Sequence, residues 1–179
     1  MLGLRYDTVQ IVPYRPEWKR AFSEERERLI DALFEIPCEI EHVGSTAVPG
    51  LSAKPILDIA IAVAPGGETS RALLALQTIG YEYRVDAGAE GGHVLVRGPA
   101  PLVRTHHIHV VAPDDPQWES YLLFRDLLRQ DKSARASYSA EKTVLGRRHR
   151  QDRDGYTAAK TEIVQRLLAK ARRGSTARD

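Results

Sequence analysis

Sulfur is scarce in this chain, whose 179 residues include one cysteine, Cys38, and one methionine. A single cysteine excludes an intramolecular disulfide framework and a cysteine-rich structural zinc site. No apolar run approaches the roughly 20 residues that cross a bilayer, and residues 1–7 contain no apolar core of a secretion signal. We therefore expect a cytoplasmic protein without a membrane partner. A single domain is expected because about 100–200 residues per domain is usual.

A strong excess of one charge is also lacking, since 26 basic and 24 acidic side chains leave a formal net charge of +2. Surfaces that bind nucleic acids usually combine clustered basic residues with aromatic side chains that stack on bases. The short basic cluster at residues 147–150 has no interleaved aromatic residue. A nucleic-acid partner is therefore not expected, and the oligomeric state is left open.

Hydrophobic periodicity predicts strands and helices in a mixed order. Alternating or continuous apolar runs indicate strands at residues 8–12, 39–43, 55–63, 81–85, 93–97 and 105–111. Helical spacing is typical of residues 16–33, 70–79, 118–129, 134–150 and 157–172. The pattern predicts an α+β fold, in which a small mixed β-sheet is flanked by helices and the C-terminal third is helical. We expect one domain over residues 1–172 and a disordered tail at 173–179.

One acidic residue interrupts an apolar strand. Residues 55–63 have the pattern of a strand covered on both faces, and Asp58 is their only charged residue. The preceding turn-rich loop contains Gly44, Ser45 and Thr46. Glycine lets backbone N–H groups approach an anion, a hydroxyl adds a donor, and a carboxylate can hold Mg²⁺. These residues are the parts that a nucleoside triphosphate site needs. The alternative, which their spacing alone favours, is a structural turn in which Asp58 caps a neighbouring loop.

Three histidines lie within residues 105–109. Because side chains alternate along a strand, His107 and His109 share one face while His106 points away. Two imidazoles on one face favour a metal site that Asp58 or His42 could complete. The alternative is that these histidines are partly exposed and hydrogen-bonded at a strand end.

Basic residues of the helical third are candidates to neutralise phosphate charge: Arg125, Lys142 and Lys160. Tyr156 lies four residues before Lys160, so the two share a face of the last helix and Tyr156 could contact a base or a phosphate. The alternative, that most of these cations are simply solvated, stays open.

Five segments resemble the GrpB family in sequence and in order. They are EHVGSTAVPGLSAKPILDI (41–59), HIHVV (107–111), FRDLLR (124–129), YSAEK (138–142) and YTAAK (156–160). The resemblance spans the chain to about residue 172 and implies a nucleotidyltransferase-like fold. In that wider superfamily a Gly-Ser motif grips phosphates, the next strand carries two carboxylates for two Mg²⁺, and a later strand carries a third.

The resemblance assigns Gly44 and Ser45 to the phosphate motif and Asp58 to the first metal carboxylate. Ala60 occupies the second carboxylate position, and His109 replaces the later acid. Two Mg²⁺ ions about 3.5–4 Å apart need bridging carboxylates, so this chain departs from the two-metal pattern.

The leading hypothesis is a metal-dependent, nucleotide-binding transferase of unknown acceptor. Asp58, His107 and His109 are its catalytic and metal-ligating candidates, with Mg²⁺ or Mn²⁺ as the ion, or Zn²⁺ if the imidazoles dominate. Lys54 joins the basic residues above as a phosphate contact. Two alternatives remain: a non-catalytic module for a nucleotide or a CoA-type ligand, and a His/Asp metal-dependent hydrolase.

Overall fold

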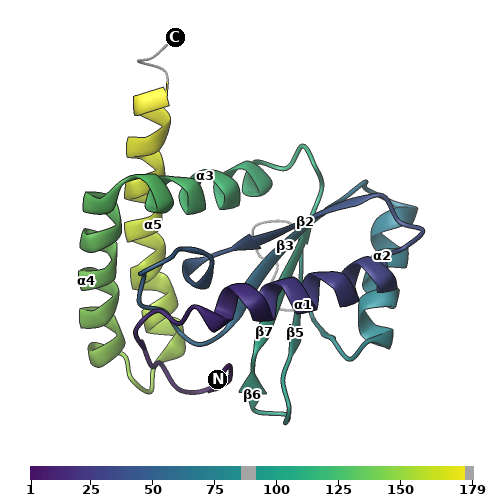
Figure 1. Ribbon diagram of the computed structural model, residues 1–179, viewed down its shortest axis with the longest axis horizontal. Coiled ribbons are helices and arrows are strands. Elements are labelled where there is room, and N and C mark those ends of the chain that lie inside the picture. Colours follow the sequence, from purple (N-terminus) through teal and green to yellow (C-terminus); the bar gives the residue numbers. More distant parts are fainter. Residues whose placement is uncertain (86–91, 176–179) are drawn as a thin grey trace.

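A mixed five-stranded sheet with the order β2-β3-β7-β5-β4 lies at the centre of the structure, a computed structural model that describes residues 1–85 and 92–175 (Figure 1). Its strands are β2 (Cys38–Val43), β3 (Leu57–Val63), β4 (Glu82–Arg84), β5 (His93–Arg97) and β7 (His106–Val111). β3 and β7 are parallel, whereas the other neighbours are antiparallel. A separate pair joins β1 (Leu4–Arg5) to β6 (Val103–Arg104).

Helices cover both faces of this sheet. They are α1 (Glu17–Ala32), α2 (Gly67–Thr78), the 3₁₀ turn η1 (Ser45–Ala47), α3 (Pro116–Gln130), α4 (Lys132–Arg148) and α5 (Arg153–Ser175). In Figure 1, α1 crosses one face of the sheet and α4 stands beside α5 on the left. Asp115 and Asp131 cap α3 and α4, because their carboxylates accept hydrogen bonds from first-turn N–H groups. No helix in the described part of the chain is long and apolar enough to cross a membrane.

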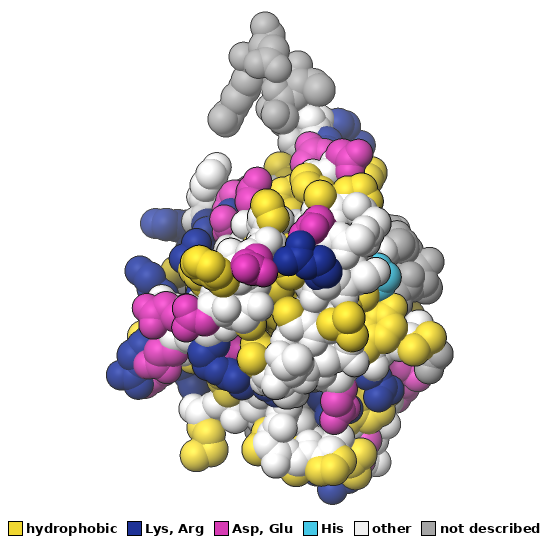
Figure 2. All heavy atoms as spheres, turned by 90° about the vertical axis from the view of Figure 1, so that its right-hand side faces the viewer, with side chains coloured by type: hydrophobic (Ala, Val, Ile, Leu, Met, Phe, Trp, Pro, Cys, Tyr) yellow, Lys and Arg dark blue, Asp and Glu magenta, His cyan; other side chains and the backbone are white. Residues whose placement is uncertain are grey.

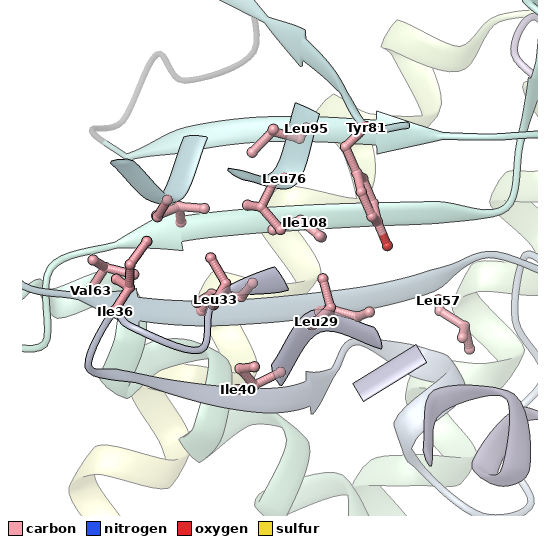
Figure 3. Close-up of a cluster of buried hydrophobic side chains, with 14 of the residues drawn as sticks. Leu29, Leu33, Ile36, Ile40, Leu57, Val63, Leu76, Tyr81, Leu95 and Ile108 are labelled. Carbon is pink, nitrogen blue, oxygen red and sulfur yellow. The ribbon is translucent and has the colours of Figure 1, made fainter. Parts of the chain in front are cut away.

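The apolar run of β3 is buried on both faces, as its pattern predicts. Leu57, Ile59, Ile61 and Val63 join the main core beneath α1 and α2 (Figure 3). The alternate residues Ala60 and Ala62 pack with Trp118 of α3. Asp58 is the exception on that second face and keeps part of its surface exposed.

A second apolar cluster attaches the loop between β2 and β3 to the helical third. Val48 and Leu51 of this loop are fully buried among side chains of α3, α4 and α5, including Phe124, Leu128 and Tyr138. The loop that carries the Gly-Ser motif is therefore fixed between the sheet and the last three helices.

Basic and acidic side chains are interspersed on the face shown in Figure 2, with scattered hydrophobic side chains between them. The near cancellation of charge in the sequence is therefore reproduced locally on this face.

The predicted α+β class, mixed sheet and helical C-terminal third are confirmed, but the first strand is placed wrongly. Of residues 8–12, only Val12 pairs, through an isolated bridge to Ala53. Val9 is instead buried at 2% exposure and donates its N–H to the carbonyl of Arg150. Alternation in this segment thus reflects burial against the helical third and not pairing in the sheet.

The last helix is longer than its periodicity predicts. α5 begins at Arg153, where Asp152 accepts a hydrogen bond from the N–H of Gly155. It continues through Ser175, so residues 173–175 of the expected tail are helical. Residues 176–179, the rest of that tail, lie outside the described residues.

Candidate functional site

The parallel pairing of β3 with β7 brings Asp58 and His107 together. The register places Asp58 opposite His107 and Ala60 opposite His109. Nδ1 of His107 lies 3.3 Å from Oδ1 of Asp58, and the side chain of Asp58 is 34% exposed. His106 points to the other face, where Nε2 lies 3.8 Å from Glu25 of α1. The predicted alternation is therefore confirmed, and Asp58 is not enclosed by apolar side chains.

The charge states of these three groups follow from their surroundings. Burial alone would raise the pKa of Asp58, but the hydrogen bond from His107 and the nearby positive charge hold it well below its usual range. Burial lowers the pKa of His107, against the effect of Asp58, and lowers that of His109 to about 4. At neutral pH the site therefore holds one carboxylate and two uncharged imidazoles.

The described residues do not fit a two-metal centre. Among them, no three His, Cys, Asp or Glu side chains come close enough to hold a metal ion. Asp58 and His107 form a pair that His109 does not complete, since the ring of His109 packs against Tyr121 with centroids 5.2 Å apart. Ala60, at the position of the missing carboxylate, is fully buried. A single carboxylate supplies too few oxygen ligands to hold two Mg²⁺ ions.

His42 does not join this site either, although it was a candidate to complete the metal ligands. It lies on the opposite face of the sheet, where its ring stacks on Phe22 of α1 with centroids 4.5 Å apart. Its Nε2 is 3.0 Å from Oγ1 of Thr46, which donates to the carbonyl of Ile56. Thr46 is 2% exposed. The Thr46 hydroxyl, predicted to bind phosphate, is thus occupied inside the protein.

The Gly-Ser motif packs directly on Asp58. Gly44 has φ +68° and ψ −167°, a conformation that only glycine adopts readily. A Cβ atom at this position would lie 2.5 Å from Oδ2 of Asp58. Gly44 and the side chain of Asp58 are therefore in direct contact.

Lys142 of α4 reaches the same loop from inside the protein. It is 1% exposed. Nζ donates to Oγ of Ser45 and to the carbonyl oxygen of Ser52, both at 2.7 Å. It also lies over the ring of Tyr138, 4.5 Å from the centroid. Burial, with the positive charge of Lys160, holds the pKa of Lys142 well below its usual range.

Lys54 and Lys160 are the half-buried cations of the site. Nζ of Lys54 lies 5.2 Å from the ring centroid of Tyr156. The Tyr156 side chain is 1% exposed, so Lys54 packs on a buried ring. Burial and repulsion from Lys160 lower the pKa of Lys54 to about 8. Tyr156 was predicted to contact a base, but its ring already contacts Lys54.

Arg125, another predicted phosphate contact, lies away from this cluster. Its guanidinium donates to Glu41 at 2.6 Å, to Asp126 at 2.8 Å and to the carbonyl of His42 at 3.3 Å. It is 8% exposed. These contacts attach α3 to the end of β2, so Arg125 has a structural role.

Periodicity alone missed two residues of the site. The ring of Tyr138 lies against Nζ of Lys142. Arg153 acts electrostatically on Asp58 and His107, and its guanidinium lies 4.6 Å from the ring centroid of Tyr6. The signal that could have found Tyr138 is the repeated Tyr-x-x-x-Lys spacing at residues 138–142 and 156–160. With Arg153, four basic side chains surround a single carboxylate.

Comparisons with known proteins agree with this geometry. A model of the GrpB protein family matches residues 8–170. A UPF0157 protein of Pseudomonas aeruginosa is 40% identical over 167 residues, which are 92% of this chain and 68% of that protein. The crystal structure of the conserved protein GrpB from Enterococcus faecalis is similar with a TM-score of 0.77 and 34% identity, over 90% of this chain and 98% of that chain.

More distant matches are similar to this chain in fold. The Cid1 poly(U) polymerase, solved with MgGTP bound, has a TM-score of 0.52 at 12% identity, over 75% of this chain and 43% of that chain. At this identity the likeness concerns the fold alone. A dephospho-CoA kinase of Mycolicibacterium paratuberculosis is 31% identical in an alignment of 175 positions that covers 85% of this chain and 43% of that protein.

Proposed function

This chain belongs to the GrpB family and has a nucleotidyltransferase-like fold, and we propose that it binds a nucleoside triphosphate and transfers a nucleotidyl or other phosphate-linked group. The observation that carries this proposal is the charge of the site, where Lys54, Lys160 and Arg153 act on one another or on Asp58. An excess of buried positive charge is costly unless an anion enters. A triphosphate supplies several negative charges at once.

The half-buried residues would contact the phosphates directly. Ser45 and the backbone beside Gly44 offer hydrogen-bond donors, and Lys54 and Lys160 offer ammonium groups. Because the described residues do not provide a resident metal centre, Mg²⁺ or Mn²⁺ would arrive with the nucleotide as part of the substrate, with Asp58 facing it. Lys142 would act through its hydrogen bond to Ser45.

His107 is the candidate base for an acceptor hydroxyl. Its ring is uncharged at neutral pH because burial lowers its pKa. Asp58 holds Nδ1 at 3.3 Å, so Nε2 is the nitrogen left to accept a proton. Within the described residues Nε2 is buried and has no hydrogen-bond partner, so an acceptor hydroxyl would reach it only after a neighbouring side chain moves.

Isothermal titration calorimetry with ATP, GTP, CTP and UTP, each with and without Mg²⁺ or Mn²⁺, tests the proposal. Lys160→Ala should weaken binding roughly 10- to 100-fold in both conditions, since a hydrogen bond to a charged group is worth about 1.5–3 kcal/mol. Asp58→Asn should weaken only the metal-dependent part. Lys170→Ala, an exposed lysine on the same helix, is the matched control and should leave binding unchanged. Absence of binding by every nucleotide at millimolar concentration would refute the proposal.

A CoA-type ligand held without catalysis is the second candidate. The similarity to a dephospho-CoA kinase favours it, and CoA also carries phosphates that the same cations would neutralise. Titration with CoA and dephospho-CoA in the same calorimeter separates the two candidates. If the ligand is of the CoA type, CoA or dephospho-CoA should bind more tightly than any nucleoside triphosphate. The hydrolase alternative has less support, since the described residues form no three-ligand metal site.

A further inference from the structure

One hydrogen bond of the site joins a hydroxyl to a buried amine. Nζ of Lys142 lies 2.7 Å from Oγ of Ser45, and its other hydrogen bond goes to the carbonyl oxygen of Ser52. Both partners are uncharged oxygens. A lysine that is 1% exposed and has no carboxylate in either hydrogen bond is stabilised in its neutral form.

The neutral amine has the orientation that a base needs. A carbonyl oxygen can only accept, so an N–H of Lys142 must point at Ser52. The nitrogen lone pair is then available to the hydroxyl of Ser45, and the hydrogen bond between them can reverse its direction. The ring of Tyr138 lies against Nζ, 4.5 Å from the ring centroid, and limits where the amine can move. A serine beside a neutral lysine is a known arrangement for an activated nucleophile.

We propose that Ser45 is a nucleophile, activated by Lys142, which attacks the α-phosphorus of the bound nucleotide and carries the nucleotidyl group as a covalent phosphodiester. The inference rests on the proposed function for its substrate. Ser45 is half-buried and Lys142 is 1% exposed, so of the two only Ser45 has surface that a ligand could contact.

The step is balanced as follows. Oγ of Ser45 bonds to the α-phosphorus, the α–β phosphoanhydride bond breaks, pyrophosphate leaves with the electron pair, and the serine proton passes to Nζ of Lys142. An acceptor hydroxyl then attacks the same phosphorus and gives its proton to His107. The Ser45–phosphorus bond breaks and Lys142 returns its proton to Oγ. The ammonium exists only while the phosphodiester anion lies beside it, so the charges that form are paired.

Labelling with a fluorophosphonate, followed by intact-mass spectrometry and peptide mapping, tests the nucleophile without a nucleotide. We expect one adduct, located on Ser45 and absent from Ser45→Ala. Lys142→Met should slow labelling by about 100-fold or more, the usual contribution of a general base. Ser52→Ala is the matched control, because only the backbone oxygen of Ser52 contacts Lys142, and it should label normally.

Two outcomes overturn the inference: no adduct on Ser45, or an adduct whose rate does not depend on Lys142. If Lys142→Met does not fold by thermal melting, Lys142→Gln takes its place, because its amide can still donate to the carbonyl of Ser52 but has no amine to accept a proton. Labelling of a folded Lys142→Gln at the rate of the unaltered protein then overturns the inference.

Radiolabelled nucleotide identifies the electrophile. Nucleotide labelled at the α-phosphate should leave its label on Ser45 and release pyrophosphate, whereas the γ-label should not be incorporated. Nucleotide binding in the calorimeter without α-label on Ser45 overturns the covalent step and leaves the proposed function standing. A fluorophosphonate adduct without any nucleotide binding refutes the proposed function and, with it, the nucleotide as the electrophile.

Discussion

Gly44→Ala tests the contact that joins the Gly-Ser motif to Asp58. Gly44 combines φ +68° with ψ −167°. Side chains other than glycine avoid this region at a cost of about 1–3 kcal/mol. The new Cβ would also lie 2.5 Å from Oδ2 and 2.9 Å from Cβ of Asp58. Crowding of this kind costs about 1–3 kcal/mol more, so we expect the free energy of unfolding to fall by about 2–6 kcal/mol.

Gly50→Ala in the same loop is the matched control. Gly50 also has a positive φ, +78°, but an added Cβ would meet nothing within 4 Å. Its substitution should therefore cost only the backbone strain, about 1–2 kcal/mol. Urea denaturation followed by circular dichroism measures both values, and the transitions are comparable where their m-values agree.

The comparison becomes specific in the Asp58→Ala background. Removing the carboxylate eliminates the 2.5 Å contact, so Gly44→Ala should then cost about 1–2 kcal/mol less, while the cost of Gly50→Ala stays the same. The reasoning is refuted if Gly44→Ala is no more destabilising than Gly50→Ala, or if its cost is unaffected by Asp58→Ala.

Three further predictions concern pH and a buried ion network. Burial lowers the pKa values of His42 and His106 to about 4, below the 6.5 of an exposed histidine, so the unfolded chain binds more protons between these values. The free energy of unfolding should therefore fall as the pH decreases from 6.5 to 4. In urea denaturation at several pH values, His106→Gln should make this slope shallower by up to about 1.4 kcal/mol per pH unit. An unchanged slope would contradict a lowered pKa for His106. The pKa of Lys54, about 8, predicts that triphosphate affinity declines as the pH rises through 8 and that Lys54→Met removes this decline, as calorimetry at several pH values would show. Glu25, 5% exposed, pairs with two arginines and the hydroxyl of a tyrosine, so Glu25→Gln should cost about 3–5 kcal/mol in urea denaturation. The exposed Glu27→Gln should change stability by less than about 0.5 kcal/mol, and similar values for the two variants would argue against a stabilising network.

Much of the fold could be predicted because the relevant signals are local. The apolar run of β3 and the alternation of β7 depend on which residues are neighbours in the chain. Asp58 was recognised from the sequence because an unpaired carboxylate inside an apolar strand is costly to bury. His107 and His109 share a face because side chains alternate along any strand. The one misplaced strand, at residues 8–12, shows the limit: a pattern indicates that Val9 is buried but not against which surface.

The candidate site could be predicted only in part, because half of its contacts join distant segments. Ser45 and Lys142 are 97 residues apart and meet only when α4 packs under the loop. Arg125 matched the expected chemistry as well as Lys160 did, but Glu41 lies 84 residues away in sequence and occupies its guanidinium. No local pattern distinguishes these two cations.

The sequence by itself determined the elements, their inward and outward faces and the presence of one carboxylate beside a Gly-Ser motif, because side-chain direction follows from backbone periodicity. Tertiary structure decided which side chains reach that carboxylate. It placed His42 on the opposite face against Phe22, used Thr46 and Arg125 as internal contacts, and buried Lys142 against Ser45. The physical reason is that burial, charge and hydrogen-bond partners at a site depend on packing between segments far apart in the chain.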